Sequence, residues 1–80
     1  MIVEVRRYAS LGASGTGQLP GDPQDVELED GATIARLLEE LALPPEAVHL
    51  VIVDGRIRHD REEALRHGAR VALFPPVGGG

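Results

Sequence analysis

The chain has no cysteine, no tryptophan and no lysine, and one tyrosine and one phenylalanine are the only aromatics among its 80 residues. Without cysteine there is no disulfide framework, no cysteine zinc site and no thiol nucleophile. The lack of cysteine fits a reducing compartment, so we expect a cytoplasmic protein. Two aromatics leave little for base stacking, and a net charge of −5 disfavours nucleic acid as a partner.

All eight basic residues are arginine. Without lysine, no side chain can accept an isopeptide bond, so copies of the chain cannot be joined through one another's side chains. Codon bias in a GC-rich genome explains the same composition, and we favour that interpretation. No apolar run approaches roughly 18 residues, so we expect no membrane span. Residues 1–7 alternate charged and apolar side chains, unlike a signal peptide.

The chain length and the order of the predicted strands and helix indicate a single small α+β domain. Residues 11–23 are rich in Gly, Ser and Pro and are expected to form a loop. Asp54-Gly55 is a two-residue hairpin signal. Alternating or continuous apolar runs predict strands at residues 2–6, 25–29, 49–53, 56–58 and 70–74. With one helix between the second and third strands, the first and last strands are expected side by side in the sheet centre.

The main helix is predicted from an apolar stripe at helical spacing. The stripe consists of Ile34, Leu37, Leu38 and Leu41. Thr33 precedes it as an N-cap, and Pro44-Pro45 is expected to end it. Residues 60–67 are expected to form one or two further helical turns, with Ala64 and Leu65 facing inward.

The C-terminal residues carry the strongest chemical signal. Pro75 and Pro76 cannot donate to a sheet ladder, so the domain is expected to span residues 1–74 and a flexible tail residues 75–80. The glycines at the tip lack a Cβ and suit a narrow channel. The Gly80 carboxylate would be ionised at neutral pH. Terminal glycines alone are more often a frayed end than a device.

The order Phe74-Pro75-Pro76-Val77 followed by Gly79-Gly80 resembles the C-terminus of the MoaD/ThiS family of sulfur carriers, particularly the small subunit of molybdopterin synthase. The resemblance runs along the chain, through residues 31–34 before the helix, residues 51–55 at the hairpin and residues 68–71 before the last strand. Gly78 stands where family members often carry Ala, Ser or Thr.

This resemblance implies a β-grasp, ubiquitin-like fold with a mixed sheet of four to five strands and one main helix on one face. It also implies that an E1-like adenylating enzyme activates Gly80 with ATP, that a thiocarboxylate forms there, and that Gly79 must stay small. The chain itself would bind no cofactor and supply no catalytic group. It would act as a co-substrate, or as the small subunit of a sulfurtransferase such as molybdopterin synthase. The implied partner-binding residues are Phe74, Pro75, Pro76, Val77, Gly78 and Ile57.

Several functions remain open at this point. Molybdopterin or tungsten-cofactor synthesis is the leading hypothesis, with a large synthase subunit or another acceptor enzyme as partner. Sulfur transfer to thiamine, tRNA or sulfur amino acids is a close variant. A protein modifier would use the same activated Gly80, whereas a non-catalytic β-grasp module would not. Phe74 and Ile57 are either core residues or exposed docking residues, and Tyr8 fits either set.

Three other patterns are assigned structural explanations. Gly12, Gly15 and Gly17 lack the lysine and the following helix of a phosphate loop, so we expect a plain hairpin loop. The three histidines have no zinc-site spacing, so we expect surface positions for them and no metal. These are His49, His59 and His67. The acidic residues 60, 62 and 63 are expected to form a solvated face.

Overall fold

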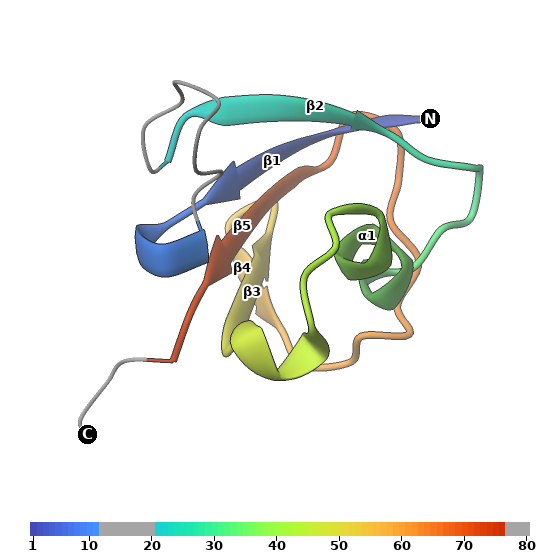
Figure 1. The fold of residues 1–80 in the computed structure, drawn as a ribbon. Coiled ribbons are helices and arrows are strands. Elements are labelled where there is room, and N and C mark those ends of the chain that lie inside the picture. Colours follow the sequence, from blue (N-terminus) through green and yellow to red (C-terminus); the bar gives the residue numbers. More distant parts are fainter. Residues whose placement is uncertain (12–20, 77–80) are drawn as a thin grey trace.

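The computed structural model describes residues 1–11 and 21–76, which form a curved sheet with a helix packed across it (Figure 1). In this part of the chain the sheet has five strands, in the order β2-β1-β5-β3-β4. The strands are β1 Ile2–Arg7, β2 Pro23–Glu27, β3 Leu50–Val53, β4 Arg56–Arg58 and β5 Arg70–Phe74. The helix is α1 Ile34–Glu40, and two short 3-10 helices, η1 Ala9–Leu11 and η2 Pro45–Ala47, lie in connections.

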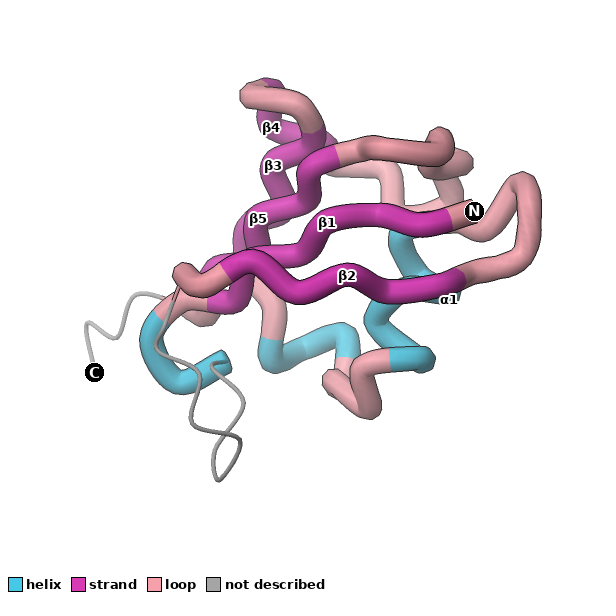
Figure 2. The backbone as a smooth tube through the Cα atoms, turned by 90° about the horizontal axis from the view of Figure 1, so that it is seen from above, coloured by secondary structure: helices cyan, strands magenta, loops and turns pink. Residues whose placement is uncertain are grey.

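The centre of the sheet is a parallel pair, β1 beside β5, with Val5 opposite Val71. The other neighbouring strands are antiparallel. A parallel pair needs a long crossover connection, and here the chain between β1 and β5 contains every other element. Figure 2 shows α1 below the sheet rather than within it. This is the β-grasp, ubiquitin-like fold that the family resemblance implied, and it confirms the α+β class predicted from the sequence pattern.

Helix α1 begins and ends with local hydrogen bonds. The Thr33 hydroxyl accepts a hydrogen bond from the Arg36 N–H at 3.1 Å, which confirms the predicted N-cap. At the other end, the N–H groups of Ala42 and Leu43 donate to carbonyls of the last turn, and Ala42 has φ of 57°. This left-handed C-terminal cap ends the helix before the prolines are reached. Pro44 therefore follows the end of α1 and does not cause it.

The core lies between α1 and the sheet. Three residues of the predicted stripe, Ile34, Leu37 and Leu38, are buried, while Leu41 is half-buried at the rim. The strands contribute alternate residues to the same core. These are Val3, Val5, Val26, Val51, Val71 and Leu73. Strand alternation therefore leaves the intervening residues on the opposite face of the sheet.

The segment between β4 and β5 corrects one prediction, because residues 60–67 contain no helix and Ala64 is exposed. Their backbone is used elsewhere. The carbonyls of Arg61 and Glu63 accept from the first N–H groups of α1, and the Leu65 N–H donates to Ala32. The free donors of the α1 N-terminus are thus satisfied by a neighbouring segment. Leu65 is buried, as predicted, but from an extended chain.

Several strand ends differ by one or two residues from those predicted. β2 begins at Pro23, two residues earlier than expected, because Pro23 lies opposite Arg6 at the end of β1. The expected loop at residues 11–23 is thus shortened, and Leu11 closes η1 as a buried residue. The Asp54-Gly55 turn is confirmed. Both of its residues have positive φ, 51° and 83°, which is the geometry of a tight hairpin.

Candidate functional site

The end of β5 is where the sequence places the chemistry. Phe74 is the last strand residue, and its carbonyl accepts a hydrogen bond from the His49 N–H at 2.8 Å. Pro75 and Pro76 follow outside the strand, as predicted from their missing N–H groups. β5 therefore holds the root of the tail from the middle of the sheet. The predicted site residues Val77, Gly78, Gly79 and Gly80 lie outside the described residues.

An aromatic stack stands at this root. The rings of Tyr8 and Phe74 lie nearly parallel, at 2°, with centroids 4.6 Å apart. The Tyr8 N–H donates to Leu73, so β1 and β5 are joined just behind the stack. Gly21 fits against the Tyr8 ring, where an added Cβ would come within 2.8 Å of Cε1. Tyr8 and Gly21 together fix the position of the Phe74 ring, which is the last side chain before the prolines.

The part of the sheet face opposite α1 that β3, β4 and β5 form is largely apolar. Leu50 lies opposite Phe74, and Ile52 lies between Ala72 and Ile57. Four of these five residues are half-buried, and Ile57 is 52% exposed. We call this set of five residues the open sheet face. Phe74 and Ile57 both belong to it and not to the buried core, Phe74 half-buried and Ile57 exposed, and their role in docking stays a prediction.

Charged residues border the open sheet face. Arg6 lies opposite Ala72 and pairs with Glu4 at 3.1 Å, and this hydrogen bond raises the pKa of the Arg6 guanidinium. A shallow hollow of about 110 Å³ runs between these two residues, Arg70 and Ile52. The face thus offers an apolar centre with charges at its edge, the composition of a protein interface.

The other sequence candidates add no site. All three histidines are exposed, as expected, and His67 Nδ1 accepts from the Ile2 N–H at 3.0 Å. Within residues 1–11 and 21–76 no group of acidic or histidine side chains could hold a metal ion. Glu63 is partly covered and pairs with Arg58, so the expected solvated acidic face is not uniform. The glycine-rich segment at residues 12–17 lies outside the described residues.

Sequence reasoning missed three members of the open sheet face. Leu50 and Ile52 sit in a nearly continuous apolar run, which predicted a central strand without indicating an exposed face. Ala72 lies in a run that alternates only partly. All three are half-exposed because a helix covers only one face of the sheet, and this depends on the tertiary structure. Gly21 was missed because its neighbour Tyr8 is distant in sequence. The described residues contain no helix long and apolar enough to cross a membrane.

The fold and the proline-led exit from its central strand define the class of small ubiquitin-like proteins that includes MoaD and ThiS. The model of the ThiS family matches residues 16–80, and the chain belongs to that family. No curated protein matches the chain.

Solved structures agree over the whole fold. SAMP1 from Haloferax volcanii has a TM-score of 0.72 at 26% identity, covering 100% of both chains. The Pyrococcus furiosus protein named "Putative molybdopterin converting factor, subunit 1" has a TM-score of 0.67 at 26% identity, covering 95% of this chain and 98% of that one. A complex of subunits 1 and 2 of the molybdopterin-converting factor from Helicobacter pylori matches with a TM-score of 0.62 at 21% identity, with full coverage of both chains.

Proposed function

We propose that the chain is a sulfur carrier in molybdopterin or tungsten-cofactor biosynthesis, acting in the cytoplasm through a thiocarboxylate at Gly80. The observation that carries the proposal is the sequence Phe74-Pro75-Pro76-Val77 with its three following glycines, attached directly to the central strand. A rigid body holds the root of the tail. The reactive group is the carboxylate at its tip.

The chemistry needs two steps, both catalysed by the partner. A carboxylate oxygen of Gly80 attacks the α-phosphorus of ATP, and pyrophosphate leaves. The resulting acyl-adenylate has an electrophilic carbonyl carbon. Hydrosulfide attacks that carbon and AMP leaves, so that a thiocarboxylate remains. Where the sulfur arrives on a persulfide donor, an acyl disulfide forms first, and a thiol reductant must cleave its S–S bond to leave the thiocarboxylate. Glycine at positions 79 and 80 keeps side chains away from the reacting carbonyl.

The open sheet face is the proposed docking surface for the adenylating enzyme. Ile57 and Phe74 supply exposed and half-exposed apolar area, while Arg6 and Arg70 supply charge at the border. Docking there would bring the tail, which begins at Pro75, to a partner's channel. The Helicobacter pylori structure pairs a protein of this fold with a second subunit, which supports a synthase subunit as the sulfur acceptor.

A second candidate is a protein modifier. The likeness to SAMP1, the small archaeal modifier protein 1 of Haloferax volcanii, over the full length of both chains favours it. In that case a lysine amine of a target would attack the activated Gly80 carbonyl and form an isopeptide bond. Since the chain has no lysine, it could not be the target of its own side-chain conjugation.

One experiment separates these functions. The chain is incubated with its adenylating enzyme and labelled ATP, and the intact mass is then followed after a sulfur donor is added. A Gly80 acyl-adenylate, followed by replacement of one oxygen by sulfur, supports the carrier. Lysine-linked conjugates in lysate, without the sulfur-bearing form, support the modifier. No adenylate at all indicates a non-catalytic interaction module.

A further inference from the structure

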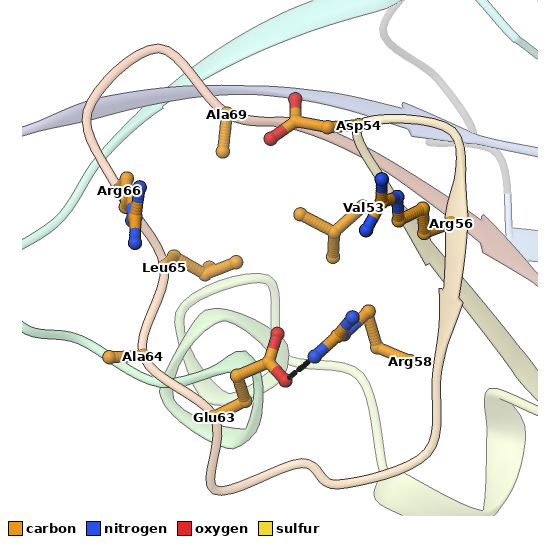
Figure 3. Close-up of a pocket in the computed structure, with 9 residues that line it drawn as sticks. All are labelled: Val53, Asp54, Arg56, Arg58, Glu63, Ala64, Leu65, Arg66 and Ala69. Carbon is orange, nitrogen blue, oxygen red and sulfur yellow. Dashed lines mark hydrogen bonds and ion pairs between the residues drawn. The ribbon is translucent and has the colours of Figure 1, made fainter.

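A cavity of about 550 Å³ lies beside β4, away from the open sheet face. Residues 54–69 run around it as a ring, with β4 on one side and the extended segment 63–66 on the other (Figure 3). This ring exists because residues 61–65 are bonded to the start of α1 and do not coil into a helix of their own. The cavity is thus a product of the fold and not a gap between loose loops.

Arginines stand around this cavity. Arg56 and Arg58 are two apart on β4, so their side chains leave the same face of the strand, and they lie opposite Val53 and Val51. Arg66 reaches in from the other side of the ring (Figure 3). Arg58 is held by Glu63, with Nε 3.0 Å from Oε1. Among the described residues, the side chains of Arg56 and Arg66 make no hydrogen bond or ion pair.

Two carboxylates also line the cavity, and both are already used. Glu63 pairs with Arg58, and Oδ1 of Asp54 accepts from the Arg70 N–H at 3.0 Å. Three arginines and two carboxylates line the cavity, so in a chain of net charge −5 this lining carries a net charge of +1 and a local positive field, with two of its guanidinium groups unpaired. A guanidinium is planar and presents paired N–H donors that match the oxygens of phosphate.

The inner wall of the cavity is apolar. Leu65 and Ala69 are each only 4% exposed, and Val53 is packed against the core. A volume of about 550 Å³ falls within the usual range of small-molecule sites. Such sites combine an apolar lining with a few placed polar groups. The arrangement suits a molecule with a carbon body and one anionic end.

We propose that this cavity binds a small phosphate monoester, with the phosphate between Arg56 and Arg66 and the organic part against Leu65 and Val53. A dianionic phosphate is favoured over a bare carboxylate because two separate guanidinium groups are available to it. The proposal does not depend on the chemistry at Gly80. The cavity borders the first residue of β5, whereas the tail leaves from the last, and the strand separates them by about 15 Å.

The test is an amide chemical-shift titration of the full chain with phenyl phosphate, and with inorganic phosphate and phenol as the two halves of the probe. We expect saturable shifts at Arg56, Leu65 and Ala69 with phenyl phosphate, binding at least tenfold weaker for inorganic phosphate, and no saturable shift with phenol. Equal affinity for phenyl phosphate and inorganic phosphate would show that the apolar wall adds nothing to binding, and would contradict the proposal. Absence of saturable shifts would end it.

Matched variants locate the charge. Arg56→Gln and Arg66→Gln are each expected to weaken phenyl phosphate binding at least tenfold, while their spectra report an intact fold. Arg7→Gln removes the same charge from an arginine at the end of β1 and is expected to bind as the parent does. Equal weakening by Arg7→Gln would mean diffuse charge attraction, against the proposal. Adenylation of Gly80 should be unchanged in all three variants, so failure here and failure of the carrier function are distinguishable.

Discussion

Replacing Gly21 by alanine tests the packing at the root of the tail. Gly21 has φ of 86°, a conformation that costs an L-residue about 1–2 kcal/mol. The new Cβ would also lie 2.8 Å from Cε1 of Tyr8, closer than real Cβ contacts. The ring is stacked on Phe74 and cannot move without opening that stack. Forced overpacking of this kind costs about 1–3 kcal/mol beyond the backbone strain.

Gly31 provides the matched control, because its φ is 83° and a Cβ there would meet nothing within 4 Å. Both variants carry the same backbone strain, so the difference between them measures the contact with Tyr8. We expect Gly21→Ala to lower the free energy of unfolding by about 1–3 kcal/mol more than Gly31→Ala. The free energies of unfolding are measured by urea denaturation, with midpoints compared at a common slope of free energy against urea concentration.

A double-mutant cycle sharpens the test. In a Tyr8→Ala background the ring is gone, so Gly21→Ala should cost no more than Gly31→Ala does. If Gly21→Ala and Gly31→Ala were equally destabilising in the parent chain, the close fit of Gly21 against Tyr8 would be refuted. The stack could then no longer be treated as fixed by its surroundings.

Four further predictions follow from the same structure. Deleting Gly79 and Gly80 should leave the melting temperature unchanged and abolish the acyl-adenylate; a truncated chain that unfolds would make the tail structural. Leu38→Ala, at a core position 1% exposed, should destabilise by about 2–5 kcal/mol in urea, and an unchanged midpoint would remove Leu38 from the core. Ile57→Asp should weaken binding to the adenylating enzyme about tenfold or more without changing stability, whereas Ile2→Asp, at the other exposed isoleucine among the described residues, should not; equal loss would contradict docking on the open sheet face. The pKa of Glu29 is lowered by the hydrogen bond from its own backbone N–H and by Arg36, so its stabilisation is present above the ordinary value of 4.5 and is lost as the pH falls through the lowered one. Glu29→Gln should therefore show a smaller fall in melting temperature than the parent between about pH 5 and about pH 3, and identical curves would rule out the contribution.

The local parts of the fold could be predicted from the sequence. Thr33 caps α1 and Ile34 and Leu38 face the core because capping and helical spacing involve residues three or four apart. The Asp54-Gly55 turn was equally clear, since its positive φ angles suit few other dipeptides. These signals need no knowledge of the rest of the chain.

The parts that were missed depend on distant neighbours. Residues 60–67 have a composition compatible with a helix, yet Arg61 and Glu63 give their carbonyls to the start of α1. The cavity formed by this extended path could not be anticipated without that contact. Gly21 likewise has no signal of its own, because its role is set by Tyr8 across the sheet. The half-exposed open sheet face depends on there being one helix layer.

The parallel pairing of β1 with β5 links assembly of the domain to completion of its polypeptide. The middle of the sheet stays empty until residue 74 has left the ribosome, because β5 is the partner of both β1 and β3. Pairing between such remote segments is also slow compared with helix formation. A chain whose synthesis stops before Phe74 would lack its innermost strand, so aborted products should be degraded before they could occupy a partner enzyme unproductively.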